Sequence, residues 1–244
     1  MSLNKFKQTT LALSVALLAV PAWAVPALQL GIQGGTYDSS TQTIFASGNS
    51  FSVVAYGLAG TAPIGDKYFL SVALLGAQQA GGSFGSFTVN GNTFNATADM
   101  TWGTPPLDDA LREWDPGDLA KHSIFPTYFK EFGFYFSGSQ QSGVFNTQDH
   151  PSWGPQSGTG LYYQQFDINI SGLAPGQGLH FDLYSEKFNK KNGLLNGDTD
   201  VNRFAPFSHD AEAHVTAVPE PETYAMLLAG LGLIGLAARR RKAR

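Results

Sequence analysis

The feature that most constrains the fold is an alternation of apolar and polar side chains along the middle of the chain. Phe166, Ile168 and Ile170 alternate with polar residues, and a similar two-residue period recurs at residues 132–136, 179–184 and 212–217. Successive side chains in a β-strand point to opposite faces, so this period predicts half-buried strands. Residues 51–58 and 68–75 are more continuously apolar, which predicts strands covered on both faces.

Turn signals separate these segments. Asn90-Gly91 lies between two short apolar stretches and predicts a hairpin with a type I′ turn, and Pro175-Gly176 marks a second turn. Helical periodicity is almost absent, apart from one or two turns expected within residues 106–120. Eight or nine short strands therefore predict an all-β protein, an antiparallel β-sandwich or jelly roll, in one domain at residues 25–217.

Composition excludes several classes of protein. The chain has no cysteine, which rules out disulfide scaffolds, thiolate zinc sites and cysteine nucleophiles. Its aromatic content of 13% argues against disorder. Residues 25–217 carry eight Lys and Arg against seventeen Asp and Glu, a net charge of −9. Nucleic-acid binding needs a basic surface, so we expect no nucleic-acid partner.

The first 24 residues have the pattern of a secretory signal peptide. Lys5 and Lys7 precede an apolar run at residues 11–20, and Ala22 and Ala24 form a small-x-small cleavage site. A helix of this run spans about 15 Å, which is half of a hydrocarbon layer of roughly 30 Å. We therefore expect cleavage after Ala24 and export of the rest of the chain across the inner membrane.

The C-terminal 27 residues form a second signal. Val218-Pro219-Glu220-Pro221 precedes an apolar run at residues 224–238, which is followed by Arg239, Arg240 and Arg241. The prolines predict an exposed, extended segment before the run. A helix of the run reaches only about 22 Å, short of a comfortable membrane span. Clustered arginines resist translocation, so the basic end is expected to stay cytoplasmic.

These parts, at residues 218–244, closely resemble the PEP-CTERM sorting signal. The resemblance implies an integral-membrane exosortase as partner, cleavage near the motif, and transfer to the cell envelope or extracellular matrix. Pro219, Glu220 and Pro221 would then be the recognition motif. The apolar run would be a transient inner-membrane anchor, and Arg239, Arg240 and Arg241 would be the stop signal. A permanent single-pass anchor is the alternative.

The body resembles a second group of exported bacterial proteins, called choice-of-anchor N. The residues that suggest this are 26–30 at the mature start and 204–211 before the tail. This resemblance implies no known activity.

One segment has the oxygen pattern of a cation site. Asp198, Asp200 and Asn202 alternate in a polar stretch, and such oxygens suit calcium. The EF-hand pattern is excluded because Arg203 stands where the turn needs glycine. The alternatives are a calcium-stabilised loop and a polar turn. No other cofactor is expected. Of the histidines, His180 and His214 fall on outward strand faces, where surface positions are expected.

No catalytic residues are predicted. Ser83 fits the nucleophile-elbow pattern, but the strand-like residues 86–89 follow where the elbow needs a helix. We therefore expect a non-enzymatic structural or adhesive protein that contacts exopolysaccharide. The alternative is a secreted glycan-binding module or glycan-active enzyme. Trp102, Trp114 and Trp153, expected in loops, would stack on sugar rings, and paired carboxylates about 5–10 Å apart would indicate the enzyme.

Overall fold

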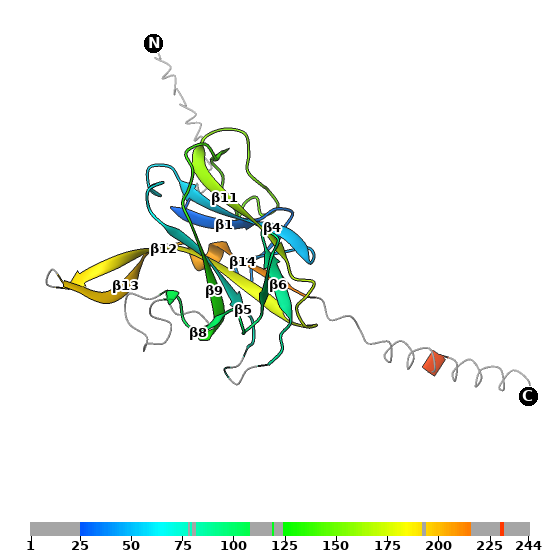
Figure 1. Ribbon diagram of the computed structural model, residues 1–244. Helices are drawn as coiled ribbons and strands as arrows, with labels where there is room; N and C mark the ends of the chain where they lie inside the picture. The colour runs from blue at the N-terminus through cyan, green and yellow to red at the C-terminus, as the bar shows by residue number, and fades with distance from the viewer. Residues whose placement is uncertain are drawn as a thin grey trace, which may run out of the picture.

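The computed structural model is a protein of two β-sheets that pack face to face (Figure 1). It describes residues 25–77, 79, 82–107, 119, 124–191, 194–215 and 230–231, with residues 187–191 and 194–199 described by backbone alone. The predicted signal peptide and most of the predicted C-terminal helix and 106–120 segment lie outside these residues. Within them, no helix has the length and apolarity needed to cross a membrane.

The first sheet is antiparallel throughout. Its strands run in the order β1, β4, β11, β6, β7, and β10 pairs with β11. The strands are β1 (Leu28–Ile32), β4 (Ser50–Leu58), β6 (Ser86–Val89), β7 (Asn92–Asn95), β10 (Gln141–Gly143) and β11 (Gly160–Asn169).

The second sheet is mixed. Its strands run in the order β2, β3, β14, β12, β5, β9, β8, and β13 pairs with β12. In Figure 1, β12 and β13 project from the body as a two-stranded ribbon. The strands are β2 (Thr36–Asp38), β3 (Thr43–Phe45), β5 (Tyr68–Leu74), β8 (Thr101–Gly103), β9 (Thr127–Phe134), β12 (Gly178–Lys191), β13 (Leu194–Phe204) and β14 (Asp210–His214), with a 3₁₀ helix, η2, at Phe207–His209 before β14.

The sandwich-like all-β architecture was predicted, with two differences. The described residues contain fourteen strands instead of eight or nine, because several strands have only three or four residues. The pairing is also not wholly antiparallel, because β14 lies parallel to β3. Parallel pairing joins strands that are distant in sequence, so a local pattern of turns gives no sign of it.

The core between the sheets contains the predicted inward faces. Phe166 and Ile168 of β11 and Ile170 just after this strand are buried in it, as are Leu179, Phe181 and Leu183 of β12. The rings of Phe51 and Phe181 meet edge to face, with centroids 6.0 Å apart. The alternation in the sequence therefore predicted the core correctly.

Two local predictions have opposite outcomes. Asn90 and Gly91 both have positive φ, at 50° and 78°, as the predicted type I′ hairpin requires. Trp102 was expected in a loop but lies in β8, opposite Tyr128 of β9. The two rings pack edge to face at 5.1 Å, a cross-strand aromatic pair of the kind that stabilises short strands.

The second sheet is also covered on its outer face. A cluster of buried apolar residues lies there, comprising Phe69, Ala73, Leu119, Phe125, Phe129 and Tyr184. Leu119 and Phe125 come from the connection between β8 and β9. Residues 178–185 of β12 are therefore buried on both faces, which determines the environment of the polar residues among them.

Candidate functional site

Four ionisable residues lie together on the outer face of the second sheet. His180 and Asp182 come from β12, and Asp210 and Glu212 come from the neighbouring strand β14. Each pair has the i, i+2 spacing that places two side chains on one face of a strand. His180 is directly opposite Glu212 in the register. Regular strand geometry thus brings two polar pairs, 30 residues apart in sequence, into one cluster.

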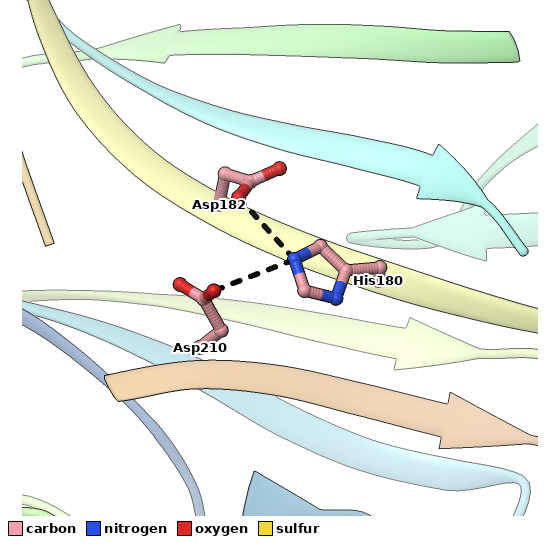
Figure 2. Close-up of side chains that lie close together, drawn as sticks. All are labelled: His180, Asp182 and Asp210. Atoms are coloured by element: carbon pink, nitrogen blue, oxygen red, sulfur yellow. Dashed lines mark hydrogen bonds and ion pairs between the residues drawn. The ribbon is translucent and has the colours of Figure 1, made fainter. Parts of the chain in front are cut away.

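The imidazole of His180 lies at the centre of the cluster. Its Nδ1 is 3.0 Å from Glu212 Oε1, and its Nε2 is 3.3 Å from Asp182 Oδ1 and 3.6 Å from Asp210 Oδ2. Figure 2 shows that both aspartates approach the same ring nitrogen, one from each strand. One carboxylate therefore contacts Nδ1 of the histidine, and two contact Nε2.

The centre of the cluster is buried. The side chains of His180, Asp182 and Asp210 are each only 3–4% exposed, and that of Glu212 is 17% exposed. The expected surface position is therefore wrong for His180. That expectation assumed that the outer face of the strand meets solvent, whereas β12 lies between β5 and β14 and is covered on both faces. His214, at 48% side-chain exposure, lies at the surface as predicted.

Burial and mutual contact shift the pKa values of these groups. Burial alone lowers the pKa of His180, but Asp182, Glu212 and Asp210 outweigh it and hold this pKa well above its usual value. Burial, with the neighbouring charge of Asp182, raises the pKa of Asp210. Burial also acts to raise the pKa of Glu212, but hydrogen bonds to His180 and His214 hold it below its usual value.

A cavity of about 330 Å³ opens onto one side of the cluster. It is bordered by polar side chains from the cluster and by residues of β3, the β2–β3 connection, η2 and the β8–β9 connection. Its lining residues are Thr41, Thr43, Ile124, His180, Phe207, Asp210 and Glu212. A small ligand or water therefore has a route to His180 and Asp210.

This cluster was not predicted, although the sequence contained a signal for it. His180 and Asp182 stand two residues apart and alternate with apolar residues, and Asp210 and Glu212 do the same. Two such pairs on adjacent strands form a cluster of carboxylates around an imidazole. The adjacency of β12 and β14 is not evident from the sequence, since β13 separates them along the chain.

The predicted calcium ligands are in a different place. Asp198, Asp200 and Asn202 lie within β13, where Asp200 is opposite Lys187 and Asp198 is opposite Asn189 of β12. They belong to a paired strand, which is neither the calcium-stabilised loop that was predicted nor the polar turn that was the alternative. No observation tests calcium binding there, and it stays a prediction.

The other predicted site residues lie outside the described part of the chain. They are the signal-cleavage residues Ala22 and Ala24, the motif residues Pro219, Glu220 and Pro221, and the arginines Arg239, Arg240 and Arg241. Trp114 lies outside it as well. Ser83 is described, and the residues after it lead into β6, as expected for a loop that is not a nucleophile elbow.

Comparison with protein families adds a finding for the tail. Residues 217–242 match the family described as the PEP-CTERM protein-sorting motif. The chain carries a PEP-CTERM sorting signal. The match includes the predicted Pro-Glu-Pro motif, the apolar run and the three arginines. It implies an exported protein that an exosortase processes and that is sorted to the cell surface. A comparison with curated proteins finds no match to the chain.

Proposed function

We propose that this protein is a non-enzymatic structural or adhesive component of the cell envelope or exopolysaccharide matrix, delivered there once an exosortase has removed its tail. The PEP-CTERM motif is the observation that carries the proposal. A short apolar run with an arginine cluster suits transient membrane retention better than permanent anchoring, because it falls short of the hydrocarbon thickness.

The position of the motif relative to the fold supports a detachable tail. Strand β14 ends at His214 and the matched motif begins at residue 217. Ala211 and Ala213 of β14 are buried in the core, whereas the Pro-Glu-Pro residues follow all the strands of the described fold. Cleavage near Pro219 would therefore leave the sandwich intact.

Intact-mass measurement of the protein recovered from its producing bacterium tests the sorting step. We expect a mass corresponding to a chain from Val25 to near Pro219. A strain without the exosortase is the control, and there the species should retain Arg244 and remain in the inner-membrane fraction. Retention of Arg244 in both strains would contradict the proposal and indicate a permanent tether.

The structural role is tested by deleting the gene and measuring cell adhesion and retention of exopolysaccharide. We expect both to decrease, and to recover with the intact chain. Recovery should fail with a Pro219→Ala/Pro221→Ala variant that folds normally but stays in the membrane. Unchanged adhesion and matrix retention in the deletion strain would refute the structural or adhesive role.

One exposed aromatic residue favours glycan binding as a second candidate function. Trp153 is 39% exposed, and its ring stacks on His150 with centroids 3.6 Å apart. Phe145 supports it from a distance of 5.6 Å. An exposed indole that neighbouring rings hold in place offers an apolar face on which a sugar ring can stack.

Glycan-array binding by the wild type and by Trp153→Ala tests this candidate. Tyr135→Ala is the matched control, because Tyr135 is a 58% exposed aromatic residue outside the His150–Trp153 stack. Loss of binding only in Trp153→Ala would support glycan recognition. Absence of binding by the wild type would leave the structural role as the better interpretation.

A further inference from the structure

We propose that His180, Asp182 and Asp210 bind one divalent transition-metal ion, with zinc as the best-suited member of this class. The ligands are His180 Nε2 and one carboxylate oxygen from each aspartate. These three atoms all lie within 4.8 Å of one another. One imidazole and two carboxylates are donor types that zinc binds in proteins, whereas calcium takes oxygen ligands alone.

The distances suit a tetrahedral site. Zinc binds nitrogen and oxygen ligands at about 2.0–2.2 Å, which places neighbouring ligand atoms roughly 3.4 Å apart. The separations from His180 Nε2 are 3.3 Å to Asp182 Oδ1 and 3.6 Å to Asp210 Oδ2. Two of the three ligand separations therefore already match a tetrahedral site, and the third, between the two aspartate oxygens, is at most 4.8 Å.

Glu212 orients the histidine for this role. Its Oε1 lies 3.0 Å from His180 Nδ1 and can accept a hydrogen bond from that nitrogen. A metal ion that replaced the Nε2 proton would then meet an Nε2 lone pair directed at the two aspartates. A carboxylate behind a ligating histidine fixes its tautomer and ring orientation in many metal sites. Glu212 is therefore a positioning residue and not a ligand.

The surroundings of Asp210 independently suit a bound cation. Its side chain is 4% exposed, and no described residue donates a hydrogen bond to its carboxylate. The nearest cationic atom recorded for it is His180 Nε2, at 3.6 Å. Ser71 lies opposite Asp182 in the register, and its fully buried hydroxyl also makes no hydrogen bond within the described residues. Buried polar atoms normally have hydrogen-bond partners, so a buried carboxylate whose described contact is one long ion pair, beside an unsatisfied buried hydroxyl, indicates a ligand.

The cavity supplies access and a further coordination position. His180 and Asp210 both line it, so an ion can reach them and a water molecule can complete a four-coordinate site. The ion would join β12 to β14, the last strand before the sorting tail. The site is separate from the tail, so loss of metal binding and failure of sorting are distinguishable outcomes.

Metal titration of the full-length chain, purified in mild detergent and treated with chelator, tests the proposal. We expect one Zn²⁺ per chain by calorimetry and a higher Tm with Zn²⁺. Co²⁺ should give the intense visible absorption of tetrahedral coordination. Asp210→Asn, which conserves side-chain size, should lose the site, and Glu212→Gln should weaken affinity roughly 10–100-fold.

His214→Gln is the matched control, because His214 touches Glu212 but is exposed and is not a proposed ligand. It should retain one tight site. If Asp210→Asn does not fold, Asp182→Asn and the Co²⁺ spectrum of the wild type replace it. Wild-type protein that binds no metal, or a folded ligand variant that binds as tightly as the wild type, would overturn the proposal.

Discussion

Truncation of Phe181 to alanine should strongly destabilise the protein, because this side chain joins the two sheets. Phe181 is fully buried on β12 and meets Phe51 of β4 edge to face. Removing a buried phenylalanine side chain typically costs about 3–5 kcal/mol, which combines lost burial with the cavity left behind. We expect about 4 kcal/mol here, since the central position of β12 leaves little room for the sheets to collapse.

Urea denaturation followed by far-ultraviolet circular dichroism measures this loss. The midpoint should fall with little change in m-value, and Tm should fall by about 8–16 °C for a domain of this size. Phe204→Ala is the control. Phe204 is 44% exposed, and its loss should cost at most about 1 kcal/mol.

A double-mutant cycle isolates the contact between the sheets. Phe51→Leu and Phe181→Leu, measured singly and together, should give a coupling energy of about 0.5–1.5 kcal/mol, the value of an aromatic pair beyond its buried area. A coupling energy of zero, or a cost of under about 1 kcal/mol for Phe181→Ala, would refute face-to-face packing of the sheets at this point.

Three further predictions concern the backbone, a surface ion pair and alkaline pH. Gly85→Ala should lower the free energy of unfolding in urea by about 2–5 kcal/mol, because φ is +85° and the new Cβ would lie 2.2 Å from the Gly172 carbonyl oxygen. Gly60→Ala is the control: φ is +86° there but the new Cβ would have no atom within 4 Å, so the loss should be only about 1–2 kcal/mol. Equal costs would contradict this reasoning. Arg203→Gln should cost at most about 1 kcal/mol despite its 2.8 Å contact with Asp66, because both side chains are partly exposed. Burial raises the pKa of Tyr68 to about 12 and also raises the pKa values of Tyr56 and Tyr184. The folded protein should therefore lose stability as pH rises from 10 through 12, and phenolate absorption from these three tyrosines should appear only at higher pH than that of exposed tyrosines. Early titration of all tyrosines in the folded protein would count against these burials.

Local patterns predicted those parts of the fold that local physics determines. Ile168 and Leu183 were assigned to the core because period-2 alternation is a property of each strand alone. The Asn90-Gly91 turn was predicted because a type I′ turn requires positive φ at two adjacent residues, and asparagine and glycine adopt it readily. The sorting motif is similarly a continuous stretch, and the family match at residues 217–242 confirms it.

Non-local arrangement was beyond the sequence pattern. The parallel pairing of β14 with β3 joins Ala211 to Ile44, and nothing near either residue indicates it. The same limit applies to His180. Its strand alternates like an amphipathic edge strand, but β5 and β14 flank it and the cluster around Phe125 and Tyr184 covers its outer face. Whether a polar residue on such a strand is exposed depends on the strand's neighbours.

The burial of His180 changes what its neighbours imply. On a solvent-exposed face, carboxylates beside a histidine need no explanation, because water solvates each of them. On a covered face, each ionised group carries a desolvation cost that a neighbouring charge or a bound ion must offset. His180 has only two ring nitrogens to share among Asp182, Asp210 and Glu212, and Asp210 is the most distant of the three, at 3.6 Å. A metal ion at Nε2 would contact both aspartates directly while Glu212 keeps its hydrogen bond. The neighbouring strands and the apolar cluster bury His180, which the sequence did not predict, and this burial makes its surroundings suited to a cation.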